Sequence, residues 1–164
     1  MRLLALTAGL TFVLDQASKW AVVHGLNLID IGSVEVVPGV LAFHMAWNTG
    51  INFGILSGQA ELTRWLLIAV ALGISAWVWL WVRREGAEPR SQVFAGLLIG
   101  GAMGNVIDRL IYGAVADFLN VSCCGIENPF AFNVADVAIF IGALGLVLFP
   151  GKTAEAAKKR RKTP

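Results

Sequence analysis

Asp136 is the residue of this chain whose position most strongly indicates chemistry. It lies in FNVADVAIFIGALGLVLF (132–149), where every residue except Asn133 and Asp136 is apolar or glycine. The run is long enough to cross a bilayer. A carboxylate inside a membrane helix costs about 2.5–3.5 kcal/mol on insertion scales, so such a residue is a candidate for a functional role. No basic residue lies within helical reach of Asp136, so a neighbouring ion pair does not account for it.

Asp117, in YGAVADFLNV (112–121), is the natural companion of Asp136. Two carboxylates that lie a few Å apart do not both ionise easily, so one keeps its proton. The ionised carboxylate can then draw a proton from water, while the protonated one polarises an amide carbonyl. This is acid–base hydrolysis without a metal or a covalent intermediate. Spacing alone does not bring the two side chains together, so their contact depends on the fold.

Five further polar residues fall on two other apolar segments. Asp15 and Lys19 form an i,i+4 pair with the acid on the N-terminal side, which is the favourable order. Asn105 is spaced i,i+3 from Asp108 and i,i+4 from Arg109. These residues either hold a helix bundle together by ion pairs and hydrogen bonds, or support a site and orient its substrate.

The composition predicts the elements that must position these residues. Of the 164 residues, 57% are hydrophobic and 15% are charged, whereas soluble domains average about 25% charged. We therefore expect an all-α membrane protein that forms one domain over residues 1–164. The first helix is interpreted as a retained span, because no convincing signal-peptide cleavage site follows it. The four expected helices cover about 3–23, 63–82, 92–111 and 131–149.

The distribution of Lys and Arg predicts the orientation in the membrane. Neither residue occurs from 20 to 63 or from 110 to 151. By the positive-inside rule, the connections at about 24–62 and 112–130 face outward, and both termini are cytoplasmic, including the basic tail at about 150–164. The polar residues of the first, third and fourth helices then share one outer layer, as a common site would require.

The outer connections contain several local signals. Gly32, Pro38-Gly39 and Thr49-Gly50 punctuate β-rich runs in the first connection, which predicts a small meander of strands. His44 is interpreted as one of its strand residues rather than a catalyst. In the second connection, the adjacent Cys123 and Cys124 are interpreted as unpaired apolar residues, without a disulfide or a metal site.

The third expected helix carries glycines at positions 96, 100 and 104. This small-xxx-small pattern predicts a helix that packs closely against a neighbour.

Two other functions are compatible with the residues alone. Intramembrane Asp, Lys and Arg also mark ion paths, so an ion- or proton-coupled transporter is one alternative. The inner half of the expected bundle, however, has no polar residue that would continue such a path. A non-catalytic membrane assembly subunit is the other alternative. Substituting Asp117 and Asp136 separates the classes, since a subunit would lose assembly while a peptidase would keep its fold and lose turnover.

Five stretches together resemble the bacterial lipoprotein signal peptidases (signal peptidase II), in the family's order and over nearly the whole chain. They are LDQASK (14–19), WNTGINF (47–53), GGAMGNVIDR (100–109), VADF (115–118) and FNVADVAI (132–139). The resemblance implies an aspartyl endopeptidase of the inner membrane, with its active site near the periplasmic face. It would cleave diacylglyceryl-modified prolipoproteins before the lipidated cysteine.

The resemblance also implies roles for individual residues. The catalytic aspartates of the family match Asp117 and Asp136, and the first outer connection matches a periplasmic β-cradle. No cofactor, no metal and no nucleic acid are expected; the partners are the prolipoprotein substrates and membrane lipids, and the chain is expected to be a monomer. The residues that match the family's substrate-binding or site-supporting positions are Asp15, Lys19, Asn48, Asn105, Asp108, Arg109 and Asn133.

Overall fold

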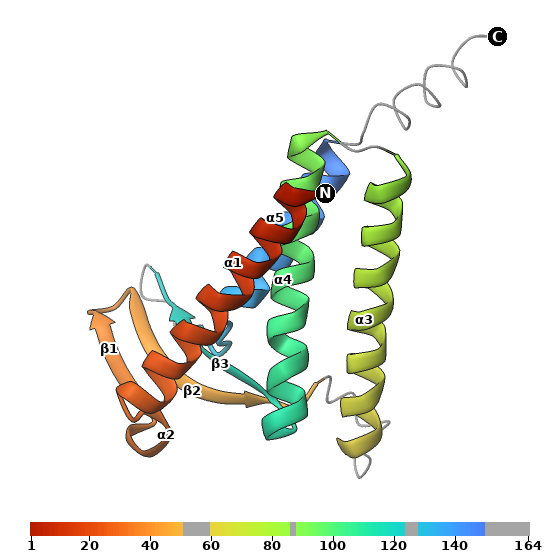
Figure 1. Ribbon diagram of the computed structural model, residues 1–164. Helices are drawn as coiled ribbons and strands as arrows, with labels where there is room; N and C mark the ends of the chain where they lie inside the picture. The colour runs from red at the N-terminus through yellow and green to blue at the C-terminus, as the bar shows by residue number, and fades with distance from the viewer. Residues whose placement is uncertain (51–59, 86–87, 124–127, 150–164) are drawn as a thin grey trace, which may run out of the picture.

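The computed structural model describes residues 1–50, 60–85, 88–123 and 128–149. Within these residues, four long helices accompany one small sheet (Figure 1). The basic tail lies outside these residues. The elements in chain order are α1 (Arg2–Lys19), a π-helix η1 (Trp20–Gly25), α2 (Leu28–Ile31), β1 (Ser33–Val37), β2 (Leu41–Asn48), α3 (Ala60–Arg84), α4 (Pro89–Tyr112), β3 (Val115–Val121) and α5 (Val134–Leu148).

Helix α4 is the centre of the bundle, in contact with α1, α5 and α3. The predicted close packing of its glycines is confirmed, because Gly96, Gly100 and Gly104 all face α1. A methyl group added at Gly100 would meet the backbone carbonyl of Ala8, and one added at Gly104 would meet the carboxylate of Asp15. Glycine at these positions therefore lets the two helices approach closely enough for the Asp15 side chain to lie against α4.

Each predicted span corresponds to a helix, with shifted boundaries. The segments Glu61–Arg84 and Pro89–Tyr112 are long and apolar enough to cross a membrane, whereas α5 is a shorter apolar helix of 15 residues. Helix α1 ends at Lys19 and continues as the π-helix η1, which the sequence did not predict. Helix α5 begins three residues later than expected, because the Asn133 side chain accepts the Asp136 N–H and so caps the helix.

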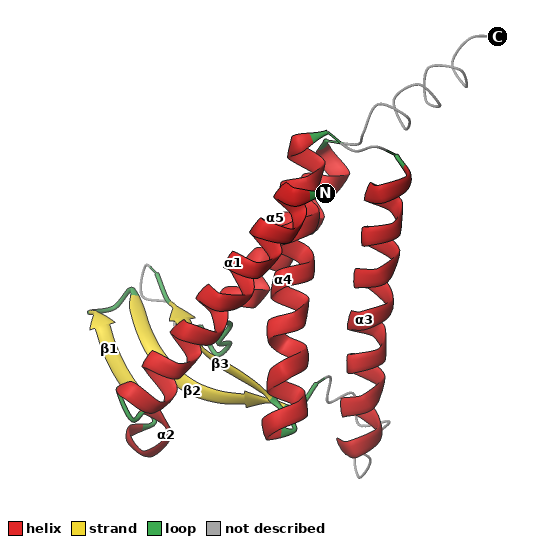
Figure 2. Cartoon of the chain, in the orientation of Figure 1, coloured by secondary structure: helices red, strands yellow, loops and turns green. Residues whose placement is uncertain are grey.

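The sheet is antiparallel with the order β1-β2-β3 and lies at one end of the bundle, away from the N-terminus (Figures 1 and 2). The predicted meander accounts for β1 and β2, and β3 comes from the second connection. In the β2–β3 register, Ala46 lies opposite Asp117 and Asn48 lies opposite Val115. The sheet therefore brings the end of β2 beside the strand that carries Asp117.

The interpretation of the cysteines as unpaired apolar residues is wrong for Cys123, which is disulfide-bonded in the structure. A disulfide-bonded sulfur has no thiol hydrogen, so Cys123 is a cross-linked residue and not an apolar filler. Cys124 lies outside the described residues.

Candidate active site

Asp117 is presented by β3 and is only 3% exposed. Two amide groups donate to its carboxylate from different elements. Asn48, at the end of β2, donates its Nδ2 to Oδ2 at 3.0 Å, and Asn133 donates its Nδ2 to Oδ1 at 2.6 Å. A buried carboxyl needs such partners, and here they hold it in one orientation.

Asp136 lies in the first turn of α5 and forms a capping box with Asn133. The Asn133 side chain accepts the Asp136 N–H at 2.9 Å, and Asp136 Oδ2 accepts the Asn133 N–H at 3.2 Å. Asn105, on α4, donates its Nδ2 to Asp136 Oδ1 at 2.9 Å. The capping box and the Asn105 donor hold the Asp136 carboxyl group in one orientation. Asp136 is also partly accessible, unlike Asp117.

The structure brings Asp117 and Asp136 into one hydrogen-bonded network. Asn133 donates to Asp117 and, at 3.3 Å, to the Asn105 Oδ1, while Asn105 donates to Asp136. Burial, followed by the charge of Asp136, raises the pKa of Asp117 from its ordinary value of 3.8 to about 6, against the opposing effect of the two asparagine donors and Lys19. The fold therefore brings Asp136 close enough for its charge to contribute to the raised pKa of Asp117.

The raised pKa of Asp117 predicts a pH dependence of stability. Because the folded state binds this proton more tightly than the unfolded state, the stabilisation is complete below the ordinary pKa of 3.8 and is lost as the pH rises through about 6. We expect the stability difference between the wild type and Asp117→Asn to change by about 2–3 kcal/mol over this range, in the variant's favour at high pH. Denaturant unfolding in detergent at several pH values measures it. A stability difference that does not change with pH would contradict the raised pKa of Asp117.

A second, largely buried network adjoins the aspartates through Asn105. Lys19 Nζ lies 2.8 Å from both Asp15 Oδ2 and Asp108 Oδ2, and it donates to Asn105 Oδ1 at 3.1 Å. The expected Asp15–Lys19 pair is present. Gln16 was not among the predicted site residues, yet its Nε2 donates to Asp15 Oδ2 at 3.2 Å and to Asp108 Oδ1 at 3.0 Å. Its position beside Asp15 within an apolar segment is the signal that could have found it.

Arg109 interacts with Asn105, its i,i+4 neighbour on α4, through the backbone of that residue. Asp108 pairs with Lys19, and no salt bridge to Arg109 occurs among the described residues. The Arg109 Nη1 donates to the backbone carbonyl of Asn105 at 3.3 Å. Its Nε is buried and has no hydrogen-bond partner within the described part of the chain. A buried guanidinium donor without a partner is available for a ligand.

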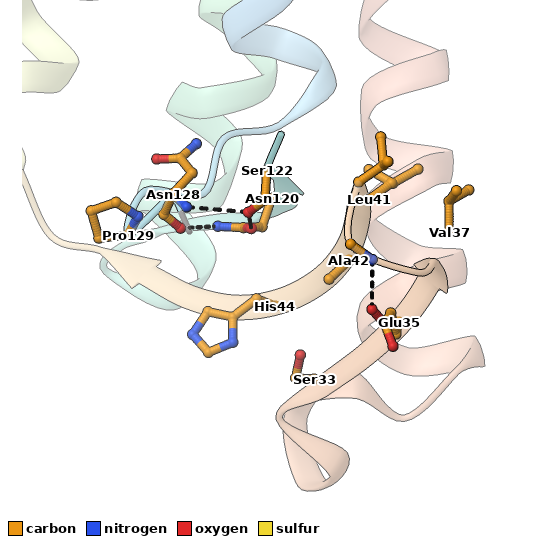
Figure 3. A pocket seen from close by; sticks show the side chains of 12 residues that line it. Ser33, Glu35, Val37, Leu41, Ala42, His44, Asn120, Ser122, Asn128 and Pro129 are labelled. Carbon is orange, nitrogen blue, oxygen red and sulfur yellow. Dashed lines mark hydrogen bonds between the residues drawn. The ribbon is translucent and has the colours of Figure 1, made fainter. Parts of the chain in front are cut away.

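A cavity of about 550 Å³ opens on the sheet and on the segment that follows β3 (Figure 3). His44, a strand residue as predicted, lines it beside Ser122 and Asn120. Several of its polar groups bond to one another: Asn120 donates to the Asn128 carbonyl at 2.7 Å, and the Ser122 hydroxyl donates to Asn120 Oδ1 at 3.3 Å (Figure 3). The residues that line this cavity include neither Asp117 nor Asp136, so the candidate chemistry lies with the aspartates and not with the cavity.

The described residues contain no group of three or more His, Cys, Asp and Glu side chains placed to hold a metal ion.

Comparison with known proteins identifies the family. The profile of the signal peptidase (SPase) II family matches residues 7–150. The chain belongs to the signal peptidase II family. A lipoprotein signal peptidase of Methylorubrum extorquens is 41% identical over 146 residues, which cover 89% of this chain and 82% of that protein. One from Rhodopseudomonas palustris is 39% identical over 150 residues, 90% of each chain.

Solved structures agree with this assignment. The chain resembles a bacterial membrane enzyme solved at 2.3 Å resolution, with a TM-score of 0.71 and 28% sequence identity over 96% of this chain and 90% of that one. A second such structure, solved at 1.9 Å resolution, gives a TM-score of 0.71 and 29% identity over 87% and 88% of the two chains. The fold is therefore that of a bacterial membrane enzyme, and the family assignment rests on the sequence comparisons.

Gly104→Ala is expected to destabilise this signal peptidase. A methyl group at position 104 would meet the carboxyl group of Asp15, which is fully buried and held by Lys19 and Gln16. Overpacking of this kind costs about 1–3 kcal/mol. Thermal unfolding in detergent measures the change. The matched control is Gly73→Ala on α3, where an added methyl group meets nothing within 4 Å. Equal melting temperatures for the two variants would show that the Asp15 carboxylate can move away.

Proposed function

We propose that Asp117 and Asp136 are the catalytic pair with which this aspartic-type lipoprotein signal peptidase cleaves its substrate. The bond would be the one before the diacylglyceryl-modified cysteine of a prolipoprotein. The observation that carries the proposal is the network in which Asn133 holds both aspartates, the second through its own backbone N–H. A carboxyl group with a raised pKa beside a second carboxylate is the arrangement that acid–base hydrolysis requires.

The environments of the two aspartates suggest different roles. Asp136 is partly accessible to water and is held by two donors, so we assign it the role of the general base. Asp117 is buried and carries the shared proton. Asp136 removes a proton from water, whose oxygen attacks the scissile carbonyl carbon while Asp117 donates its proton to the carbonyl oxygen. Collapse of the tetrahedral intermediate returns that proton to Asp117, and Asp136 protonates the leaving amine.

Two polar residues beside the pair are suited to hold the peptide. Asn48 is exposed and already donates to Asp117, so a substrate carbonyl beside the pair lies within reach of its amide. Arg109 has a buried Nε without a partner in the described chain. A substrate backbone or lipid oxygen would satisfy this donor, so we assign both residues to substrate orientation.

The proposal includes a membrane arrangement. Helices α1, α3, α4 and α5 of a single domain would all span the bacterial inner membrane, with both termini in the cytoplasm and the sheet on the periplasmic side. The absence of Lys and Arg from 20 to 63 and from 110 to 151 supports this orientation. Two acyl chains would hold the substrate in the bilayer, because each buried CH₂ contributes about 0.8 kcal/mol. One chain carries every proposed site residue, so a monomer is sufficient.

The test is cleavage of a diacylglyceryl-modified prolipoprotein by the purified chain in detergent, with a metal chelator present throughout. Mass spectrometry of the products should place the cut directly before the lipidated cysteine. The same prolipoprotein with that cysteine replaced by serine, and therefore without lipid, is the matched substrate control and should remain uncut. Equal cleavage of both substrates, or a cut elsewhere, would contradict the proposed specificity.

A further inference from the structure

The backbone N–H group directly before each proposed catalytic aspartate donates to a buried carboxylate. Ala135, which precedes Asp136, donates to Asp15 Oδ1 at 2.9 Å. Ala116, which precedes Asp117, donates to Asp108 Oδ2 at 3.2 Å. The same contact therefore occurs twice, at equivalent positions on α5 and on β3. Both distances lie in the usual range for N–H···O hydrogen bonds, so each backbone group is attached to its carboxyl group.

The two carboxylates that hold these backbone groups are joined to each other. Lys19 lies 2.8 Å from an oxygen of each, and the Gln16 amide donates to both. Asp15 and Asp108 are 0% and 1% exposed, so water does not compete for these contacts. The result is one continuous chain of polar contacts from the backbone of α5, through α1 and α4, to the backbone of β3.

Lys19 also acts on the orientation of an amide in the catalytic network. It donates to Asn105 Oδ1, which leaves the Asn105 Nδ2 pointing at Asp136 Oδ1. Among the described residues, the hydrogen bonds and salt bridges of the Asp15 and Asp108 side chains involve neither Asp117 Oδ atoms nor Asp136 Oδ atoms. They touch the neighbouring backbone and hence act on the reacting groups indirectly.

We infer that Asp15, Lys19 and Asp108 form a clip that sets the separation of the two catalytic carboxylates by fixing the backbone immediately before each of them. This inference rests on the proposed catalytic pair. Asp15 and Asp108 are positioning residues, and each uses one carboxylate both to balance Lys19 and to hold one backbone N–H. A shift of about 1 Å in the placement of a catalytic group can cost 10²-fold in rate, so the clip acts on turnover.

The test compares Asp108→Ala with Asp108→Asn in the full-length chain. Both substitutions leave Lys19 paired with Asp15, so the remaining buried charges are balanced. The asparagine keeps an oxygen that can accept the Ala116 N–H, whereas alanine does not. We expect Asp108→Ala to lower kcat by about 100-fold with KM unchanged. Asp108→Asn should keep a kcat close to that of the wild type. If only the charge of Asp108 mattered, the asparagine variant would lose as much kcat as the alanine variant.

Cleavage rates are divided by the folded fraction, measured by thermal unfolding in the same detergent. Val78→Ala is the control, since Val78 is buried in the apolar core cluster of the bundle; it should lower stability and leave kcat per folded molecule unchanged. A folded Asp108→Ala with wild-type kcat overturns the clip, and so do equal losses for the alanine and asparagine variants. If Asp108→Ala gives no folded protein, Asp15→Ala and Asp15→Asn, which act on the Ala135 N–H, are judged by the same criterion.

The proposed catalytic pair is tested separately. An active wild type, inert Asp117→Asn and Asp136→Asn variants, and a fully active Asp108→Ala would reject the clip and keep the catalytic pair.

Discussion

Replacing either Asp117 or Asp136 with asparagine is expected to lower kcat by at least 10²–10⁴-fold, about the contribution of a positioned general acid or base. Asparagine has nearly the size of aspartate but neither accepts a proton from water nor donates one to an oxyanion. At position 136 it removes the base. At position 117 it removes the acid and also places an amide against the donors of Asn48 and Asn133. Single-turnover cleavage of the lipidated substrate measures the loss.

The double variant provides a sharper criterion. Because the two carboxylates act as a unit, Asp117→Asn with Asp136→Asn should be little worse than either single variant. Asp30→Asn is the matched control, since Asp30 is an exposed acid whose side chain accepts a hydrogen bond from Asn27; it should keep wild-type turnover. If either active-site variant is folded and cleaves at the wild-type rate, that aspartate is structural and the assignment of the pair is wrong.

Lys19→Met should have the largest effect on stability. The substitution leaves the carboxylates of Asp15 and Asp108 buried and without their common cation. Breaking a buried ion pair by removing one partner costs about 3–5 kcal/mol. Unfolding by a denaturing detergent, followed by circular dichroism, gives the change. Arg83→Met is the control, because Arg83 is exposed and lies over the Trp79 ring, a contact worth about 1 kcal/mol or less.

Adding Asp15→Asn and Asp108→Asn to Lys19→Met tests the cause of that destabilisation. The triple variant has no buried charge at these positions but keeps similar side-chain volumes, and such replacements are often neutral. We expect it to regain a large part of the stability that the single variant loses. A triple variant as unstable as Lys19→Met would show that the loss comes from packing of the lysine side chain and not from the uncompensated charges.

The sequence predicted the four long helices, since each follows from a pattern within one segment. The i,i+4 spacing of Asp15 and Lys19 identified their ion pair. The same reasoning did not find that Asp108 bonds to Lys19 instead of lying beside Arg109, because spacing along α4 carries no information about α1.

The proximity of Asp117 and Asp136 could not be predicted for the same reason, because it depends on contacts between separate segments. The position of Asp117 depends on the register of β3 against β2, where it lies opposite Ala46. That register joins strands from two separate connections. The position of Asp136 depends on the first turn of α5, which Asn133 caps. Each segment could be recognised alone, but only the packed bundle with its sheet decides that the two carboxylates share Asn133.

The bond between Ala135 and Asp15 joins residues 120 positions apart and links the first long helix to the last. Synthesis proceeds from the N-terminus, so α1 and its buried carboxylate are made well before the helix that supplies the partner N–H. A nascent chain that has inserted α1, α3 and α4 contains Asp117 but neither Asp136 nor the donors that α5 brings. If Asp117 and Asp136 are the catalytic pair, as proposed, a chain truncated before Val134 cannot cleave its substrate, and proteolytic competence would arise only when α5 joins the bundle.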